Sequence, residues 1–290
     1  MRNFVIMTDS SCDLPSEMAA DLELSVVSLS VLIQGKSYVN YLDNRELPSK
    51  TFYDLLRHGE KGSTSAVNVE QFSREMERIL QTGQDILYLG FSTGLSGTYS
   101  AGTVAAEEMR TKYPEAQILT VDTLCASLGE GMIVSLAVQE KRSGKSILEV
   151  RDFVEANKLH LCHWVAVDDL QHLKRGGRIS AAAAFFGSAL NVKPIIHVDN
   201  EGKLIPVEKI KGRKNSIKRL VQHLTDTGIN LSEQTLFLCH GDCPEEANML
   251  ADIIRSETLV RDIVIGPIGP VIGAHAGPGT LALFFLGTER

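Results

Sequence analysis

The chain has 290 residues, of which 43% are apolar, and a formal net charge of −7. This length exceeds that of most single domains, so we expect two packed domains, and the acidic balance argues against nucleic acid as the main partner. No apolar run reaches the ~20 residues that cross a bilayer, and the first one turns polar at Thr8, before a signal peptide could develop. We therefore expect a cytoplasmic protein without stable membrane insertion.

Strand and helix patterns alternate at the start of the chain. A short strand is predicted at residues 4–7, followed by a polar loop at 8–13 and a second strand at 24–33. The spacing of apolar residues predicts helices at 50–57 and 69–80.

The alternation continues toward the middle of the chain. A strand at 85–89 enters a loop rich in glycine and serine at 90–97, and a helix follows at 101–110. A strand at 117–121 and a helix at 128–141 repeat the pattern. Such repeats indicate a parallel sheet flanked by helices, with ligands bound at the carboxyl ends of the strands.

The pattern changes after residue 160. A hairpin is predicted around 193–207, so antiparallel pairing begins there. Strands at 235–239 and 260–265 surround a further helix at 244–255. The predicted fold class is therefore α/β with two domains: an N-terminal domain at 1–160 that holds the parallel sheet, and a C-terminal mixed α+β domain at 161–290.

The five cysteines do not indicate a disulfide framework, because they are odd in number and widely spaced. Cys239, His240 and Cys243 have side chains that ligate zinc, but no second cluster stands nearby in sequence to complete a tetrahedral site. We prefer a strand that ends at Cys239 and a helix that begins at Asp242. No metal site is predicted.

Three clusters of hydroxyl residues stand beside predicted strands and helices, at 8–11, 63–65 and 92–98. Hydroxyl side chains at such places usually cap helices or close turns. The third cluster joins a strand to a helix start, where free backbone amides favour an anion. Ser96 and Thr98 add hydroxyl donors there.

His275 stands in a segment rich in glycine and proline at 266–279, for which we predict a rigid loop. A histidine in such a segment holds one imidazole in a defined place, although a satisfied core histidine is the more frequent case. The hydroxyl clusters elsewhere in the chain favour a ligand-binding role for His275.

Enzyme signatures are incomplete. Thr98 replaces the second glycine of a nucleophile elbow. Residues 144–146 resemble the end of a phosphate-binding loop, but Gln139 replaces its first glycine. The alternative to a binding protein is a hydrolase or phosphotransferase that uses Ser96 with His275 as base.

Six motifs occur in order along the chain: TDSSCDL at 8–14, TS at 64–65, LSGTY at 95–99, LKRGGRI at 173–179, VKPI at 192–195, and IGPVIG running on to HAGPG at 268–279. With them the chain resembles the DegV family of bacterial fatty-acid-binding proteins over about residues 3–288. The resemblance implies two α/β domains that enclose one long-chain fatty acid, such as palmitate, in a tunnel between them.

The resemblance also implies the residues of the site. Thr64 and Ser96 are expected to hydrogen-bond the carboxylate, with His275 close by; the secondary candidates are Ser65, Gly97 and Thr98. Family members present the acid to a separate fatty acid kinase. The leading hypothesis is thus a non-catalytic lipid-binding protein whose ligand is a fatty acid and which has no cofactor.

Two further segments are candidates for contacts. A turn at 173–178 is expected before an alanine-rich helix at 181–190, which forms either the wall along the acyl chain or an ordinary part of the core. Many relatives carry Lys-x-Arg where this chain has Lys209-Ile210-Lys211. The following basic stretch docks a partner or a phosphate, or forms a solvated turn; its candidate residues are Lys211, Arg213 and Lys214.

Overall fold

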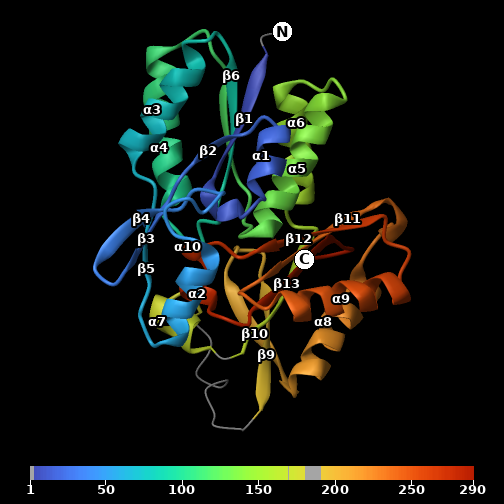
Figure 1. Ribbon diagram of the computed structural model, residues 1–290. Helices are drawn as coiled ribbons and strands as arrows, with labels where there is room; N and C mark the ends of the chain where they lie inside the picture. The colour runs from blue at the N-terminus through green and yellow to red at the C-terminus, as the bar shows by residue number, and fades with distance from the viewer. Residues whose placement is uncertain (1–2, 169, 180–190) are drawn as a thin grey trace.

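The computed structural model describes residues 3–168, 170–179 and 191–290. It contains a parallel sheet flanked by helices and a separate mixed sheet, so the predicted α/β class is confirmed (Figure 1). The alanine-rich segment at 181–190 lies outside the described residues, and the domain boundary at residue 160 stays a prediction. No helix of the described ranges has both the length and the apolar character needed to cross a membrane.

The N-terminal sheet is parallel throughout, with the order β2-β1-β6-β7. Its strands are β1 (Phe4–Asp9), β2 (Ser25–Val27), β6 (Asp85–Gly90) and β7 (Ile118–Asp122). One face is covered by α3 (Val69–Leu80) and α4 (Thr98–Lys112) (Figure 1). The other is covered by α1 (Ser16–Asp21), α5 (Leu128–Arg142) and α6 (Ile147–Asn157).

The second sheet has the order β10-β9-β8-β13-β11-β12. Its strands are β8 (Leu161–Ala166), β9 (Val192–Val198), β10 (Leu204–Lys211), β11 (Thr235–His240), β12 (Asp262–Pro267) and β13 (Leu281–Leu286). β11 and β12 pair in parallel, and the other pairings of these strands are antiparallel. Two helices lie against this sheet, α8 (Arg213–Thr227) and α9 (Pro244–Glu257) (Figure 1).

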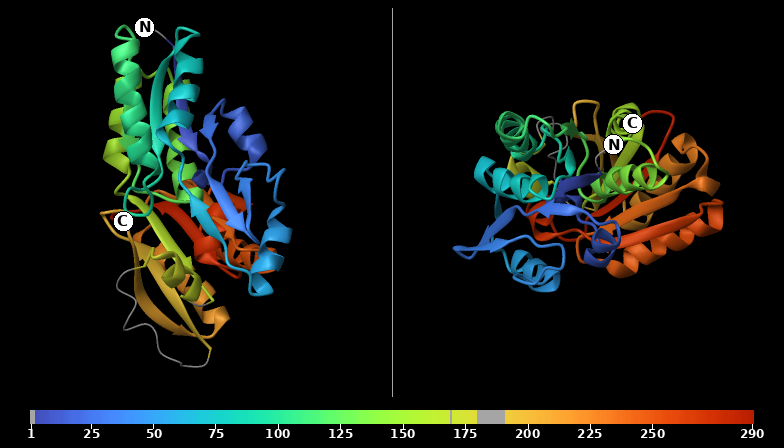
Figure 2. Two further views of the ribbon diagram at one scale, coloured as in Figure 1. Left: turned by 90° about the vertical axis from the view of Figure 1, so that its left-hand side faces the viewer. Right: turned by 90° about the horizontal axis from the view of Figure 1, so that it is seen from above.

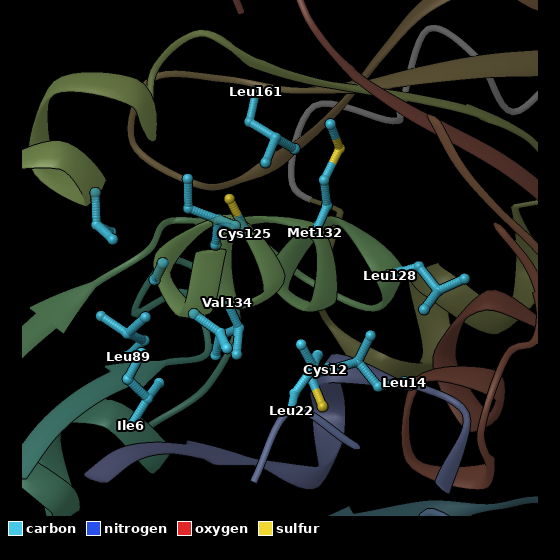
Figure 3. Close-up of a cluster of buried hydrophobic side chains, with 14 of the residues drawn as sticks. Ile6, Cys12, Leu14, Leu22, Leu89, Cys125, Leu128, Met132, Val134 and Leu161 are labelled. Atoms are coloured by element: carbon cyan, nitrogen blue, oxygen red, sulfur yellow. The ribbon is translucent and has the colours of Figure 1, made fainter. Parts of the chain in front are cut away.

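Helix α5 packs against both large sheets. The residues from Leu128 to Ser135 are all buried, because the helix contacts β1 on one side and β8, β11 and β13 on the other. Figure 3 shows Leu128 and Met132 of this helix among Leu89 of β6 and Leu161 of β8. Residues of both large sheets therefore belong to one buried apolar cluster around α5.

A third, small sheet is not predicted by the sequence pattern. Its order is β4-β3-β5, and its antiparallel strands are β3 (Ser30–Ile33), β4 (Lys36–Val39) and β5 (Ser63–Ser65). Figure 2 shows its hairpin projecting from the side of the molecule. β5 contacts α10 (Pro270–Ala276), which in turn packs on α2 (Ser49–Arg57). The hydroxyl cluster at 63–65 is thus a strand.

The predicted single strand at 24–33 is wrong. The segment is divided into β2 and β3, which belong to different sheets. Between them the N–H of Leu29 donates to Ser10 Oγ at 3.0 Å instead of to a neighbouring strand. This side-chain acceptor allows the backbone to leave the first sheet.

Three boundaries near the site also differ from the predictions. The turn predicted at 173–178 contains a helix, α7 (Gln171–Gly176), which ends at Gly177 with φ 70°. The loop predicted at 266–279 contains α10, because Pro270 suits the first helical turn and Gly277 ends it at φ 82°. The helix after Cys239 begins at Pro244, as the predicted range 244–255 has it, and the start at Asp242 is wrong because the φ of 54° at Asp242 is left-handed.

Asp13 is buried where the two large sheets meet. One carboxyl oxygen accepts a hydrogen bond from Ser127 Oγ at 2.5 Å, and the other accepts one from the N–H of Gly269 at 3.1 Å. Burial, with a contribution from the charge of Asp9, raises the pKa of Asp13 to about 7. Because Gly269 immediately precedes α10, this carboxyl group fixes the start of the helix that bears His275.

The substitution Asp13→Asn should remove a pH dependence of folding stability. The unfolded aspartate titrates near 3.8 and the folded one near 7. The folded state therefore binds more protons between these values, and the wild type loses stability as pH rises through this window. Denaturant unfolding measured from pH 4 to 7 should show that the unfolding free energy of the variant rises relative to that of the wild type by on the order of a few kcal/mol. A stability difference that does not change with pH would contradict this assignment.

Candidate functional site

An apolar cavity lies between the two large sheets. Its empty volume is about 970 Å³, including the open mouth. Its apolar lining includes Leu29, Phe91 and Leu95 from N-terminal elements and Val165, Ile196 and Phe284 from the second sheet. The polar residues that reach it include Thr64, Ser96, Ser127, His163, Arg178 and His275. The structure thus brings the three primary candidates to one cavity.

The side chains of Thr64 and His275 are hydrogen-bonded to each other. Thr64 lies on β5 and His275 in the last turn of α10, and these two elements are in contact. Thr64 Oγ1 and His275 Nε2 are 2.9 Å apart, within hydrogen-bond distance. The other ring nitrogen, Nδ1, is buried and has no hydrogen-bond partner among the described residues. Thr64 therefore holds the ring from one side only.

The imidazole of His275 is neutral at physiological pH. Burial, followed by the positive charge of Arg178, lowers its pKa to about 4. A neutral imidazole carries one N–H and one lone pair. His275 therefore exchanges a single hydrogen bond with Thr64 and does not offer a full positive charge to a ligand.

Ser96 lies in the loop between β6 and α4. Its Oγ is 2.9 Å from Thr98 Oγ1 and accepts the N–H of Thr98 at 3.2 Å. The preceding carbonyl, that of Leu95, accepts a hydrogen bond from Arg178 Nε at 3.1 Å. The loop of Ser96 is thereby tied to the end of α7, next to the Thr64–His275 pair.

The secondary candidates differ in position. Gly97 lines the cavity, whereas Thr98 is buried behind Ser96 and supports it. Ser65 is exposed, because alternate residues of β5 point to opposite sides and Thr64 takes the side of the cavity. The structure adds Arg178, whose contact with the loop of Ser96 is not predicted by the motif at 173–179.

The basic stretch after β10 is not uniformly exposed. The Arg213 guanidinium donates to Glu246 at 2.7 Å and to the carbonyl of Gly279 at 2.5 Å, and its side chain is 15% exposed. It therefore fastens the chain just after α10. Lys211 and Lys214 are exposed and remain candidates for a partner contact.

The cysteine and histidine cluster at 239–243 does not form a ligand set. Cys239 is buried and its pKa is raised by burial, so the thiol is protonated. No group of three or more His, Cys, Asp or Glu side chains in the described segments is arranged to hold a metal ion.

Comparisons with known proteins find members of the DegV family by sequence and by structure. Residues 3–288 match the profile of the DegV family of uncharacterised proteins. A DegV domain-containing protein of Clostridium perfringens is 49% identical over 290 residues, which cover 100% of this chain and 99% of the relative.

Solved structures are similar over the same extent. A DegV family protein from Thermus thermophilus, described by its fatty acid binding, has a TM-score of 0.87 and 28% identity, covering 99% of this chain and 100% of its own. DegV from Bacillus subtilis, described as a fatty acid binding protein, has a TM-score of 0.84 with the same identity and coverage.

The neutral state of His275 can be measured directly. Long-range ¹H–¹⁵N NMR of the imidazole should show a pKa of about 4, with a neutral ring near pH 7. In Arg178→Gln the pKa should rise, because a nearby positive charge is lost, yet stay below 6.5 because the ring remains buried. Titration of the wild-type ring near 6.5 would show that the ring is exposed to solvent and would refute this geometry.

Proposed function

Because the chain belongs to the DegV family, we propose that it binds one long-chain fatty acid, such as palmitate, in the cavity between its sheets. Relatives of the same fold that are described as fatty-acid-binding support this ligand class. In this proposal the protein transports the lipid in the cytoplasm, or presents its carboxylate to a separate fatty acid kinase, and performs no chemistry itself.

The observation that carries the proposal is a contrast within one cavity. Its walls are largely apolar, and the polar residues that reach it include two hydroxyl groups and a neutral imidazole at Thr64, Ser96 and His275. A ligand that fits this lining has a long apolar part and one small polar group. A fatty acid has this composition.

In this proposal each hydroxyl group donates a hydrogen bond to the carboxylate. If His275 donates from Nε2, Thr64 Oγ1 accepts that proton and its own hydroxyl is left to donate to the ligand. Ser96 Oγ accepts the N–H of Thr98, and if Thr98 Oγ1 also donates to it, the Ser96 hydroxyl is likewise left to donate to the ligand. Hydrogen bonds to an ionised carboxylate are stronger than those between neutral groups.

The tail supplies most of the affinity. Each buried methylene contributes about 0.8 kcal/mol, so a sixteen-carbon acid gains roughly 12 kcal/mol before costs. Ordering the ligand and its tail offsets a large part of this gain. The head group is then needed for orientation, which two hydroxyl donors can provide without an ion pair.

The alternative of a serine-dependent enzyme has less support in this geometry. A nucleophile and its base need to lie within hydrogen-bond reach, with the base oriented by a third group. His275 Nε2 is bonded to Thr64, Ser96 is bonded to Thr98, and no described residue holds His275 Nδ1. Ser96 and His275 are thus hydrogen-bonded to other residues instead of to each other, as a nucleophile and its base would need to be.

An open hollow at the head-group end supports presentation to a kinase. It shares Thr64, Arg178 and His275 with the cavity, and Lys61 and Arg175 also line it. A carboxylate held at Thr64 would therefore lie next to solvent beside positive side chains. Such a place suits an acid that has to receive a phosphoryl group from another protein.

Removal of either hydroxyl group should weaken palmitate binding. Thr64→Val and Ser96→Ala each remove one hydrogen bond to a charged group, worth about 1.5 kcal/mol, so we expect a roughly tenfold higher Kd. Ser37→Ala, at an exposed serine of β4, is the control. Calorimetry on delipidated protein measures the affinities. Unchanged affinity in both variants would exclude the hydroxyl pair from the site, and a wild type that binds no palmitate would reject the ligand.

Charge reversal on the basic stretch tests presentation separately. The double variant Lys211→Glu/Lys214→Glu should slow ATP-dependent phosphorylation of bound palmitate by a fatty acid kinase about tenfold, because complementary surface charge sets association rates. Its palmitate affinity should not change, since neither residue lines the cavity. Lys36→Glu on the projecting hairpin is the control. An unchanged rate would exclude this surface, and failure of the wild type to be phosphorylated would exclude presentation.

A further inference from the structure

Gly176 is the last residue of α7 and lies against the ring of His275. A Cβ atom added to Gly176 would lie 2.1 Å from His275 Nδ1, far closer than real Cβ contacts. Its φ is not in the left-handed region, so the backbone alone does not require glycine here. The neighbouring Gly177 is the opposite case: its φ is 70°, and nothing lies within 4 Å of an added Cβ. Gly176 is thus required for space, and Gly177 for conformation.

The ring of His275 is fixed from two directions. Nε2 bonds Thr64 Oγ1 at 2.9 Å, while the Nδ1 edge fills the space that a side chain at position 176 would occupy. A ring that moved away from its present place would lose its hydrogen bond to Thr64. Nδ1 makes no hydrogen bond with the described residues that could replace it. The Gly176 position therefore determines whether Nε2 reaches Thr64.

The segment at the end of α7 also contacts the loop of Ser96, which carries the second hydroxyl group of the site. Arg178, two residues after Gly176, donates from Nε to the carbonyl of Leu95 at 3.1 Å, next to Ser96. One short segment thus contacts both halves of the head-group site. The charged side chains that line the hollow beside His275 are Lys61, Arg175 and Arg178.

We propose that Gly176 is a positioning residue for the head-group site: its missing side chain seats the imidazole of His275 so that Nε2 reaches Thr64. The effect on fatty acid affinity rests on the proposed function, whereas the effect on His275 does not. The variant Gly176→Ala adds one methyl group and removes no hydrogen-bonding group from the site.

Gly176→Ala should displace the ring and raise the Kd for palmitate about tenfold, the loss expected for one hydrogen bond. His275→Ala should cause a similar loss. The double variant Gly176→Ala/His275→Ala should bind no more weakly than His275→Ala alone, because the methyl group then has no ring to displace. Losses that add in the double variant would overturn the proposal.

Gly266→Ala is the matched control. Gly266 lies on β12 outside the cavity lining, and an added Cβ would meet its nearest neighbour, Leu128 Cδ1, at an ordinary 3.5 Å. This variant should keep wild-type affinity. A tenfold loss in Gly266→Ala would show that glycine substitution in the core disturbs binding by itself, and would overturn the assignment to Gly176.

A readout in lipid-free protein separates this inference from the proposed function. In Gly176→Ala the pKa of His275, followed by NMR, should rise from about 4 toward the ordinary value, because the displaced ring loses burial. An unchanged titration would overturn the proposal, even if the protein binds no palmitate. If Gly176→Ala does not fold, the double variant Gly176→Ala/His275→Ala should fold as well as His275→Ala. A double variant that also fails to fold would overturn the proposal that Gly176 positions the ring.

Discussion

The hydrogen bond between Thr64 and His275 joins two elements that stand 211 positions apart in the chain. It requires β5 to lie against α10, and the ring that takes part in it is neutral, with one N–H and one lone pair. Burial provides that state, and the nearby charge of Arg178 reinforces it. In the proposed function this neutral pair orients a carboxylate without gripping it as an ion pair would.

The core of the fold is coupled to this pair through buried polar contacts. Asp13 bonds Ser127 at the start of α5 and the amide of Gly269 at the start of α10. The phenol of Tyr53 on α2 also donates to the carbonyl of Ile268 at 3.0 Å. Both contacts fix the chain just before α10, so the position of His275 depends on the packing of the two large sheets against each other.

Strongly periodic elements were predictable from the sequence. The helix predicted at 69–80 coincides with α3, and the strand at 85–89 with most of β6. Family resemblance and local chemistry point to Thr64, Ser96 and His275, and the structure places them at one cavity. The bond between Thr64 and His275 has no local signal, because it depends on how distant segments meet.

Short elements and close contacts were not predictable for the same reason. β5 has three residues and α7 six, too few to display a period, and contacts with distant segments define them. Arg178 stood in a basic turn motif, and only the structure shows that it reaches the carbonyl before Ser96. The need for glycine at position 176 arises from an imidazole on another helix, which no local pattern records.

Native mass spectrometry of the protein purified without added lipid tests the central claim most directly. The expected mass is that of the chain plus one fatty acid, which is released as the free acid when the protein is denatured. A chain that carries no lipid, even after exposure to fatty acids, would contradict a lipid-binding cavity. An added mass that stays attached after denaturation would indicate covalent chemistry and contradict the binding role.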